Sequence, residues 1–180
     1  SFDAGSWFGP EFSGERVPLL TEVLQTCEGN IGVNIEIKPT ARGDIVSILS
    51  ETLCTYKELD RVLVSSFDID LLLELKKLQP SLAYAYAFFD MEMLHQLKTE
   101  NWLIHQRYPR LELSLEEHIR RAKSLGFTDI NFRWSVLNSQ LVQCCHDLGL
   151  MVNCWTVDEP DDLRRMLRCK VDGIITNYPD

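Results

Sequence analysis

The strongest constraint on the fold is a regular alternation of strand-like and helix-like segments along most of the chain. The strand-like runs are residues 33–38, 62–67, 82–88, 129–134, 151–157 and 172–177. Helix-like segments lie before and between them, at residues 18–28, 43–53, 68–79, 91–98, 114–126, 138–149 and 158–168. Repeated β-α units with short connections imply a parallel sheet covered by helices. A doubly wound open sheet and a (β/α)8 barrel both satisfy this rule.

The ends of the predicted helices carry capping residues. Ser114 followed by Glu117 is the sequence pattern of a capping box, and Asn138 and Asp158 are predicted N-caps of the next two helices. Gly126 and Gly149 are predicted to end two of these helices, because glycine readily adopts the left-handed conformation that closes a helix. The capping residues therefore agree with the alternation.

The first strand-like run, VNIEIK at residues 33–38, favours the barrel. A central strand of a doubly wound sheet is apolar on both faces. Here the two faces differ: one carries Val33, Ile35 and Ile37, and the other carries Asn34, Glu36 and Lys38. A barrel wall explains this pattern if the apolar face packs outward on helices and the polar face looks inward. Catalytic groups of such barrels lie at the carboxyl ends of strands, so the periodicity points Glu36 and Lys38 at a site.

Length and charge restrict the kinds of partner. The chain has 180 residues, enough for one domain with its own core, so residues 1–180 are predicted to form a single domain. No apolar run approaches the roughly 18 residues of a membrane span, and no transmembrane segment is expected. The net charge of −9 argues against nucleic-acid binding, which depends on basic surface. A phosphate-bearing ligand would therefore need a local cation, for which a bound metal ion is the obvious candidate.

The six cysteines predict free thiols. They include no C-x-x-C pair and no spacing typical of a zinc site. Four of them lie in apolar helical or strand patterns, so we expect buried thiols in a reducing compartment and a cytoplasmic location. Because the first residue is Ser1, we expect a chain that is processed, tagged or cut from something longer, and the absence of a signal peptide says little about location.

The Glu-x-Lys strand end permits two interpretations. A carboxylate that faces a cavity is a hard oxygen ligand suited to Mg²⁺ or Ca²⁺. A lysine on the same face is well placed to contact a phosphate oxygen. Glu36 and Lys38 would then be half of a metal-assisted phosphate site, since one carboxylate is not a metal site by itself. The alternative is an intramolecular ion pair that closes the mouth of the barrel.

Five groups of segments, spread along the chain, share their pattern with a known family. They are DAGSWF (3–8) with FSGE (12–15), VPLL (17–20) and VL (23–24); NIEIKP (34–39); VSSFD (64–68); GL (149–150) with WTVD (155–158); and VDGIITNYP (171–179). Together they resemble the glycerophosphodiester phosphodiesterase family, which folds as a (β/α)8 barrel. The resemblance aligns residues 34–39 with the third strand of that fold and residues 171–179 with the eighth.

The resemblance implies roles for three residues. The glutamate of the family's Glu-x-Lys motif is a divalent-metal ligand, which here is Glu36, with Mg²⁺ or Ca²⁺ as the expected ion. The lysine of that motif contacts the phosphodiester, which here is Lys38. The tryptophan of the Trp-Thr-Val motif lies near the substrate, so Trp155 is expected either to form an apolar wall for the glycerol or alcohol part or to fill the barrel.

The rest of the family's catalytic apparatus does not occur in this sequence. It comprises a His-Arg-Gly motif, a Glu-x-Asp pair of metal ligands and a histidine in a His-Asp pair, carried mainly by the first two strands. We therefore expect an incomplete (β/α)8 TIM-type barrel that lacks the first two β-α units, which is consistent with 180 residues against about 250 for a whole barrel. His95, His118 and His146 are predicted surface or packing residues, and His105 is assigned no role.

Three functional hypotheses follow. The first is a metal-dependent hydrolase of lipid metabolism that cleaves small glycerophosphodiesters to glycerol 3-phosphate and an alcohol, in which this chain alone is inactive because the catalytic histidines are absent. The second is a non-catalytic barrel remnant that serves as a binding or assembly piece. The third is an unrelated α/β binding module in which Glu36 and Lys38 form only an ion pair.

Overall fold

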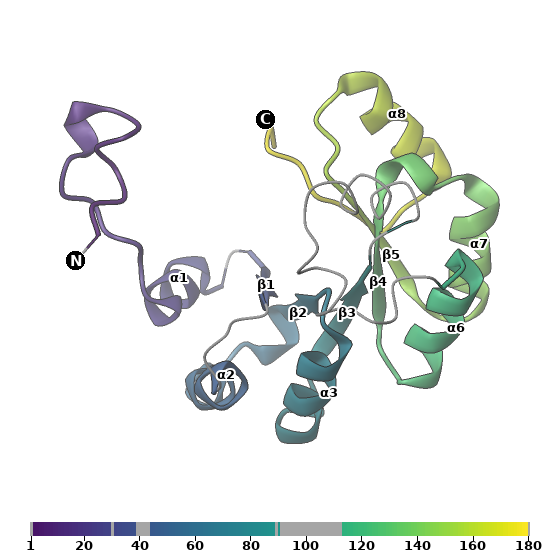
Figure 1. Cartoon of the computed structure of the whole chain (residues 1–180), viewed down its shortest axis with the longest axis horizontal. Coiled ribbons are helices and arrows are strands. Elements are labelled where there is room, and N and C mark those ends of the chain that lie inside the picture. The colour runs from purple at the N-terminus through teal and green to yellow at the C-terminus, as the bar shows by residue number, and fades with distance from the viewer. Residues whose placement is uncertain (1, 30, 39–43, 89, 91–112, 180) are drawn as a thin grey trace.

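The six predicted strands form one parallel sheet. The computed structural model describes residues 2–29, 31–38, 44–88, 90 and 113–179. The strands are β1 (Val33–Glu36), β2 (Val62–Ser66), β3 (Ala83–Ala87), β4 (Asp129–Arg133), β5 (Met151–Trp155) and β6 (Gly173–Ile174). Each strand pairs in parallel with the next one along the chain, in the order β1-β2-β3-β4-β5-β6 (Figure 1).

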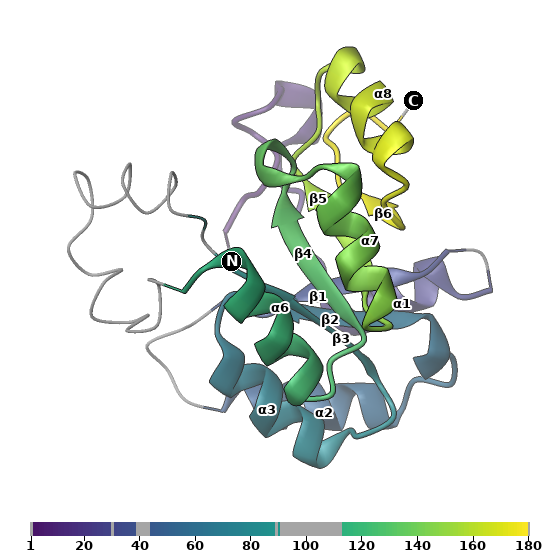
Figure 2. The same cartoon turned by 90° about the vertical axis from the view of Figure 1, so that its right-hand side faces the viewer.

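Helices follow the strands and cover one side of the sheet. They are α1 (Leu20–Cys27), α2 (Ile45–Cys54), α3 (Ile69–Leu78), α6 (Leu115–Ser124), α7 (Ser139–Asp147) and α8 (Pro160–Cys169). Short 3-10 turns occur at Pro10–Phe12, Leu59–Arg61 and Trp134–Val136. In Figures 1 and 2 helices α2, α3, α6, α7 and α8 lie in sequence around the outer side of the curved sheet. The predicted helix at residues 91–98 lies outside the described residues.

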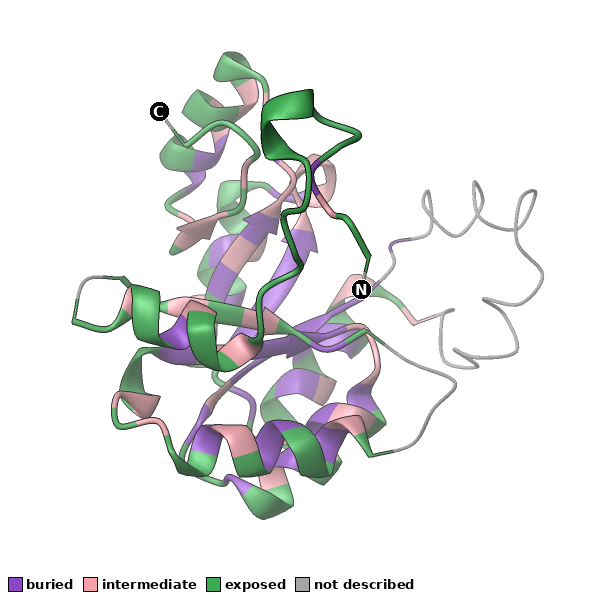
Figure 3. Cartoon of the chain, turned by 90° about the vertical axis from the view of Figure 1, so that its left-hand side faces the viewer, coloured by how far each residue is buried: buried purple, intermediate pink, exposed green. Residues whose placement is uncertain are grey.

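The hydrophobic core lies between the outer face of the sheet and these helices. Strand residues that are fully buried there alternate along β2, β4 and β5, and they include Val64, Ile130, Phe132, Val152 and Cys154. Fully buried residues of the helices that face them include Leu53, Leu72, Leu75 and Met166. Figure 3 shows these buried positions along the strands and on the helix sides that face them. The period of two along each strand thus matches one face packed on helices.

The inner face of the sheet carries polar side chains that bond to one another. Asn153 on β5 donates from Nδ2 to Asp129 Oδ1 at 3.1 Å and to Asn131 Oδ1 at 3.0 Å. On the same face, between β1 and β2, Ser65 Oγ donates to Asn34 Oδ1 at 2.9 Å. Burial raises the pKa of the Asp129 carboxyl group. Interiors of such barrels are usually packed with bulky branched residues, so a layer of hydrogen-bonded polar groups distinguishes this sheet.

A single contact shows that the sheet curls. Phe67, directly after β2, meets Trp155 on β5 with ring centroids 5.5 Å apart. In a flat sheet, three strand spacings of about 4.8 Å would separate β2 from β5, and the two rings could not meet. They meet here because curvature brings inward-facing side chains together. The predicted barrel wall is therefore confirmed as a six-stranded, curled, parallel half-barrel.

The curled sheet has two edges among the described residues. Strands β1 and β6 stand at the ends of the strand order and each pairs on one side only. Such edges expose backbone donors and acceptors that can pair with another strand. A two-edged sheet is what the sequence predicts for six consecutive strands of a barrel.

The opening segment is organised by one carboxylate. Asp3 accepts hydrogen bonds from the amides of Gly5, Ser6 and Gly14 and from the Ser6 hydroxyl, at 2.7 to 3.0 Å. These donors, the Ser6 hydroxyl foremost, hold the pKa of Asp3 well below its usual range. The segment stands apart from the sheet and leads into α1 (Figure 1).

Several sequence predictions need correction. The first helix begins at Leu20 rather than at residue 18, and α8 has Glu159, not Asp158, as its N-cap. The Asp158 carboxylate is committed elsewhere, to residues after β6. The Ser114 capping box and the Asn138 cap are confirmed.

The cysteine prediction holds in part. All six thiols are free, and Cys145, Cys154 and Cys169 are buried as predicted. Cys54 and Cys144 are exposed, because they lie on the outward sides of α2 and α7. Within the described residues, every helix is too short or too polar to cross a lipid bilayer.

Two histidines take up the packing and surface positions predicted for them. His118 on α6 is only 2% exposed, lies 3.0 Å from the Tyr86 hydroxyl through Nδ1, and stacks on Phe88 at 4.1 Å. Burial lowers the pKa of His118 to about 4. His146 is half-buried on α7, with Nε2 2.8 Å from Asp172.

We predict that His118 makes the stability of the chain fall in mild acid. The unfolded chain takes up a proton on this histidine near pH 6.5 and the folded chain only near pH 4. The contribution is therefore complete above pH 6.5 and is lost as the pH falls to 4, by up to about 3 kcal/mol. Urea unfolding from pH 8 to 4 measures it, with His118→Phe as the non-titrating variant. A difference between wild type and variant that does not change with pH would contradict the prediction.

Candidate functional site

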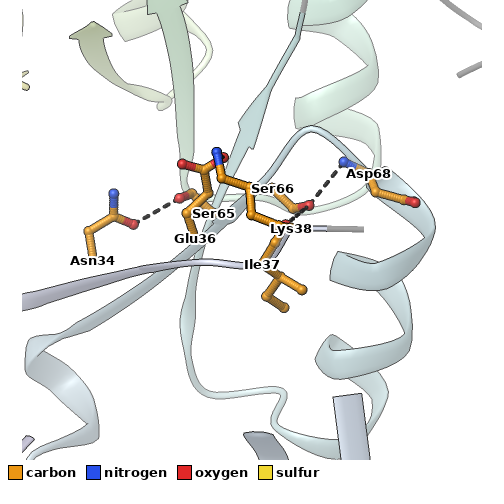
Figure 4. A network of polar contacts seen from close by, with 7 residues as sticks. All are labelled: Asn34, Glu36, Ile37, Lys38, Ser65, Ser66 and Asp68. Carbon is orange, nitrogen blue, oxygen red and sulfur yellow. Dashed lines mark hydrogen bonds and ion pairs between the residues drawn. The ribbon is translucent and has the colours of Figure 1, made fainter. Parts of the chain in front are cut away.

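Glu36 is the last residue of β1, and Lys38 follows it two positions later. The register joins Glu36 to Ser65 of β2, and the Ile37 amide donates to the Ser65 carbonyl oxygen at 2.8 Å. Ile37 itself is buried on the outer face, whereas Glu36 and Lys38 project from the other face (Figure 4). The structure thus places both predicted site residues together at the carboxyl end of the strand, as the alternation of VNIEIK predicts.

A buried hydroxyl holds this strand end in place. Ser66 is fully buried; its Oγ donates to the Ile37 carbonyl oxygen at 2.7 Å and accepts from the Asp68 amide at 3.0 Å (Figure 4). Asp68 in turn is the N-cap of α3 and accepts from the Asp70 amide. One serine therefore connects the end of β1 to the junction of β2 and α3.

The two charged side chains form an ion pair. Lys38 Nζ lies 2.6 Å from Glu36 Oε1, and the side chains are 72% and 35% exposed. Exposed pairs of this kind contribute roughly 0 to 1 kcal/mol, so ligand contacts can replace this one at little cost. The intramolecular ion pair, which was the alternative interpretation of the Glu-x-Lys strand end, is therefore present. Its presence is compatible both with that interpretation and with a metal-assisted phosphate site.

The described residues supply too few ligands for a divalent ion. Glu36 contributes one carboxylate at the strand end, and within the described ranges no three His, Cys, Asp or Glu side chains gather in a group that could hold a metal. Oxygen-ligated Mg²⁺ and Ca²⁺ need several ligands, of which carboxylates supply the charge. The donors present fit part of such a site and not the whole of it.

Trp155 lies at the carboxyl end of β5 and contacts Phe67 rather than the ion pair. The two rings meet edge to face, with an interplanar angle of 81°. The indole Nε1 is buried and has no hydrogen-bond partner within the part of the chain that the structure describes. Among the described residues, no hydrogen bond or ring contact joins Trp155 to Glu36 or Lys38, although all three belong to the same end of the sheet.

Asp158 ties together the segments that follow β5 and β6. Its Oδ1 accepts from the Asn177 amide at 2.9 Å and from Thr176 Oγ1 at 3.1 Å, and its Oδ2 accepts from Asn177 Nδ2 at 2.9 Å. The Asn177 amide is the main reason that the pKa of Asp158 lies below its ordinary value. This clamp explains why Asp158 is not the cap of α8.

Sequence reasoning assigned no role to Ser66 or Phe67, and it assigned Asp158 a different one, as a helix cap. Ser66 and Phe67 lie in VSSFD, which served only as a matching segment, and the Asp158 pattern resembled a helix cap. Their contacts with Ile37, Trp155 and Asn177 join residues that lie 29, 88 and 19 positions apart along the chain. Local patterns therefore carry no signal for these contacts.

The whole chain matches one protein-family model. Residues 1–180 match the glycerophosphoryl diester phosphodiesterase family. A glycerophosphodiester phosphodiesterase of Caldanaerobacter subterraneus is 31% identical over 186 residues, which cover 99% of this chain and 65% of that protein. The chain thus spans a little under two-thirds of the length of this relative.

Solved structures agree with this match. A glycerophosphodiester phosphodiesterase of Parabacteroides distasonis is 26% identical with a TM-score of 0.70, over 92% of this chain and 62% of that one. A phosphodiesterase of Oleispira antarctica, solved with the product sn-glycerol-3-phosphate, has a TM-score of 0.73 at 22% identity. That likeness covers 98% of this chain and 64% of the other, and shows a shared fold.

We predict that Ser66→Ala loosens the end of β1 and destabilises the chain by about 1 to 3 kcal/mol, because the buried Ile37 carbonyl and the half-buried Asp68 amide lose their partner. Urea unfolding gives the loss of stability, and hydrogen exchange of the Asp68 amide reports the broken contact. The matched control is Ser65→Ala, whose hydroxyl bonds Asn34 instead. If the Asp68 amide exchanges at the wild-type rate in Ser66→Ala, the positioning role is wrong.

Proposed function

The chain belongs to the glycerophosphoryl diester phosphodiesterase family, and on this premise we propose that it forms part of a metal-dependent hydrolase. The substrate would be a small glycerophosphodiester, cleaved to glycerol 3-phosphate and an alcohol. The observation that carries the proposal is the paired placement of Glu36 and Lys38 at the carboxyl end of β1 in a chain that matches the family throughout. The bound product of the Oleispira antarctica protein supports the same ligand class.

Each of these two residues would serve a different part of the ligand. The Lys38 ammonium would exchange its contact with Glu36 for a phosphate oxygen, which it can do because its side chain is 72% exposed. The freed Glu36 carboxylate would be one oxygen ligand of Mg²⁺ or Ca²⁺, an ion that offsets negative charge on the phosphate. The remaining ligands would come from outside the described residues.

Proton transfer would need groups that the described residues do not place at this strand end. Cleavage of a phosphodiester by general acid–base catalysis requires one group to deprotonate the attacking oxygen and another to protonate the departing alcohol. Of the described histidines, His118 is buried behind the sheet and His146 is bound to Asp172. We therefore propose that two further β-α units complete the barrel at the edges of β1 and β6 and supply these groups, and that this chain alone does not turn over substrate.

The test is hydrolysis of glycerophosphocholine with Mg²⁺ or Ca²⁺, by the 180-residue chain and by a chain extended at its N-terminus with a His-Arg-Gly and a Glu-x-Asp motif. We expect turnover only in the extended chain. There, Lys38→Ala should lower kcat/KM by about 100-fold, the size of effect seen when one charge-stabilising contact is removed. Glu36→Gln should in addition raise the metal concentration needed for half-maximal activity.

Matched controls are Glu74→Gln and Lys77→Ala, two exposed residues of α3 far from the strand end. Both should retain wild-type rates. Unchanged activity and metal dependence in Glu36→Gln would refute the ligand role. Equal turnover in the short chain would refute the need for further units, and an inactive extended chain would favour the non-catalytic remnant.

A further inference from the structure

Strand β4 ends in an arginine on the inner face of the sheet. Ile130 and Phe132 are fully buried against the helices, whereas Asn131 accepts a hydrogen bond from Asn153 on the inner face. The backbone at Arg133 remains extended, with φ −64° and ψ 132°, so the alternation of side chains continues to the end of the strand. Arg133 therefore shares the inner face with Asn131 and lies at the carboxyl edge.

The pairing register places Arg133 next to the aromatic pair of Phe67 and Trp155. Arg133 and Trp155 are Cα partners at the ends of β4 and β5. Neighbouring parallel strands lie about 4.8 Å apart, so the two side chains leave the same face of the sheet side by side. The Trp155 ring in turn meets Phe67 across the curled sheet, with centroids 5.5 Å apart. The arginine thus lies on the β5 side of the aromatic pair.

Lys38 lies on the other side of that pair, next to β2. Glu36 is the Cα partner of Ser65, and the same parallel register puts Lys38 level with Phe67. Strands β1 and β4 are three apart in the sheet order, as β2 and β5 are, so curvature brings their inner sides toward each other as well. The two cationic residues, Lys38 and Arg133, therefore lie on opposite sides of the aromatic pair.

A second cation at this edge faces the part of the ligand that the first does not meet. A phosphodiester group carries a single negative charge, and under the proposed function Lys38 contacts it. Of the two ester arms, the glycerol arm is neutral and common to all glycerophosphodiesters, whereas the alcohol arm differs in charge from one substrate to another. Because charge acts over several ångströms, a fixed guanidinium discriminates between these alcohols even without touching them.

We propose that Arg133 is a specificity-determining residue that disfavours substrates with a cationic alcohol, such as choline, and favours those whose alcohol carries hydroxyl groups. The proposal rests on the proposed function and narrows its substrate class to glycerophosphodiesters of polyols. A guanidinium is a permanent cation with a planar set of N–H donors, so it donates to hydroxyl oxygens and repels a quaternary ammonium group. Repulsion of the wrong ligand is a common source of specificity.

The test compares the affinity of the 180-residue chain for glycerophosphoglycerol and for glycerophosphocholine, by isothermal titration calorimetry with Mg²⁺ present. We expect Kd to be about 10-fold lower for glycerophosphoglycerol, the size of one like-charge repulsion over roughly 10 Å at the effective dielectric of a protein. Arg133→Gln keeps an N–H donor and removes the charge, so its ratio of the two Kd values should approach 1. Arg133→Lys should retain the preference, because it retains the charge.

Arg120→Gln is the matched control. It removes the same formal charge from α6, on the outer side of the sheet, where Arg120 pairs with Glu116. Its Kd ratio should equal the wild-type ratio. Raising the salt concentration should reduce the wild-type ratio and leave that of Arg133→Gln unchanged, because salt screens charge and not the fit of the ligand. A loss of fold would not give this pattern, since both Kd values would rise together.

The possible results separate this proposal from the proposed function. If Arg133→Gln keeps the wild-type Kd ratio, whether or not both diesters bind more weakly, Arg133 does not select the alcohol and the proposal is wrong. A wild-type preference for glycerophosphocholine would refute it as well. In either case, weaker binding of both diesters by Lys38→Ala would leave the proposed function standing. If the wild-type chain binds neither diester, the ligand class of the proposed function fails, and the selectivity fails with it.

Discussion

The curled parallel sheet, packed on helices by one face only, is the constraint on which the rest of the molecule depends. Because side chains alternate along a strand, packing one face on α2 to α8 forces the other face inward. Parallel pairing brings every carboxyl end to the same edge, so Glu36 on β1 and Trp155 on β5 share it although 119 positions separate them in the sequence. A site built from strand ends of this chain therefore lies at the carboxyl edge of the sheet.

The carboxyl edge of the sheet is held in place by residues that have no proposed part in the reaction. Ser66 joins the end of β1 to the start of α3, and Phe67 beside it restrains Trp155. Asp158 joins the segments after β5 and β6 through its hydrogen bonds with Asn177. Such supports keep the residues that would meet a ligand in place, which is a general need of preorganised sites.

The charged pair and the aromatic pair at the carboxyl edge differ in whether their polar groups have partners within the chain. Glu36 and Lys38 neutralise each other in an exposed pair that is easily exchanged. The buried Trp155 N–H has no such partner in the described ranges. Under the proposed function the charged pair would meet a phosphodiester, and the remaining metal ligands would come from outside the described residues.

Sequence periodicity by itself determined the order of strands and helices, the inward face of VNIEIK and the joint position of Glu36 and Lys38, because each of these follows from local alternation and from the parallel rule. It also predicted the caps at Ser114 and Asn138, where donor and acceptor lie three residues apart. Only the tertiary structure decided that Asp158 clamps Asn177 and that Phe67 meets Trp155. These contacts arise when curvature and parallel pairing bring distant segments together, and no local pattern encodes that approach.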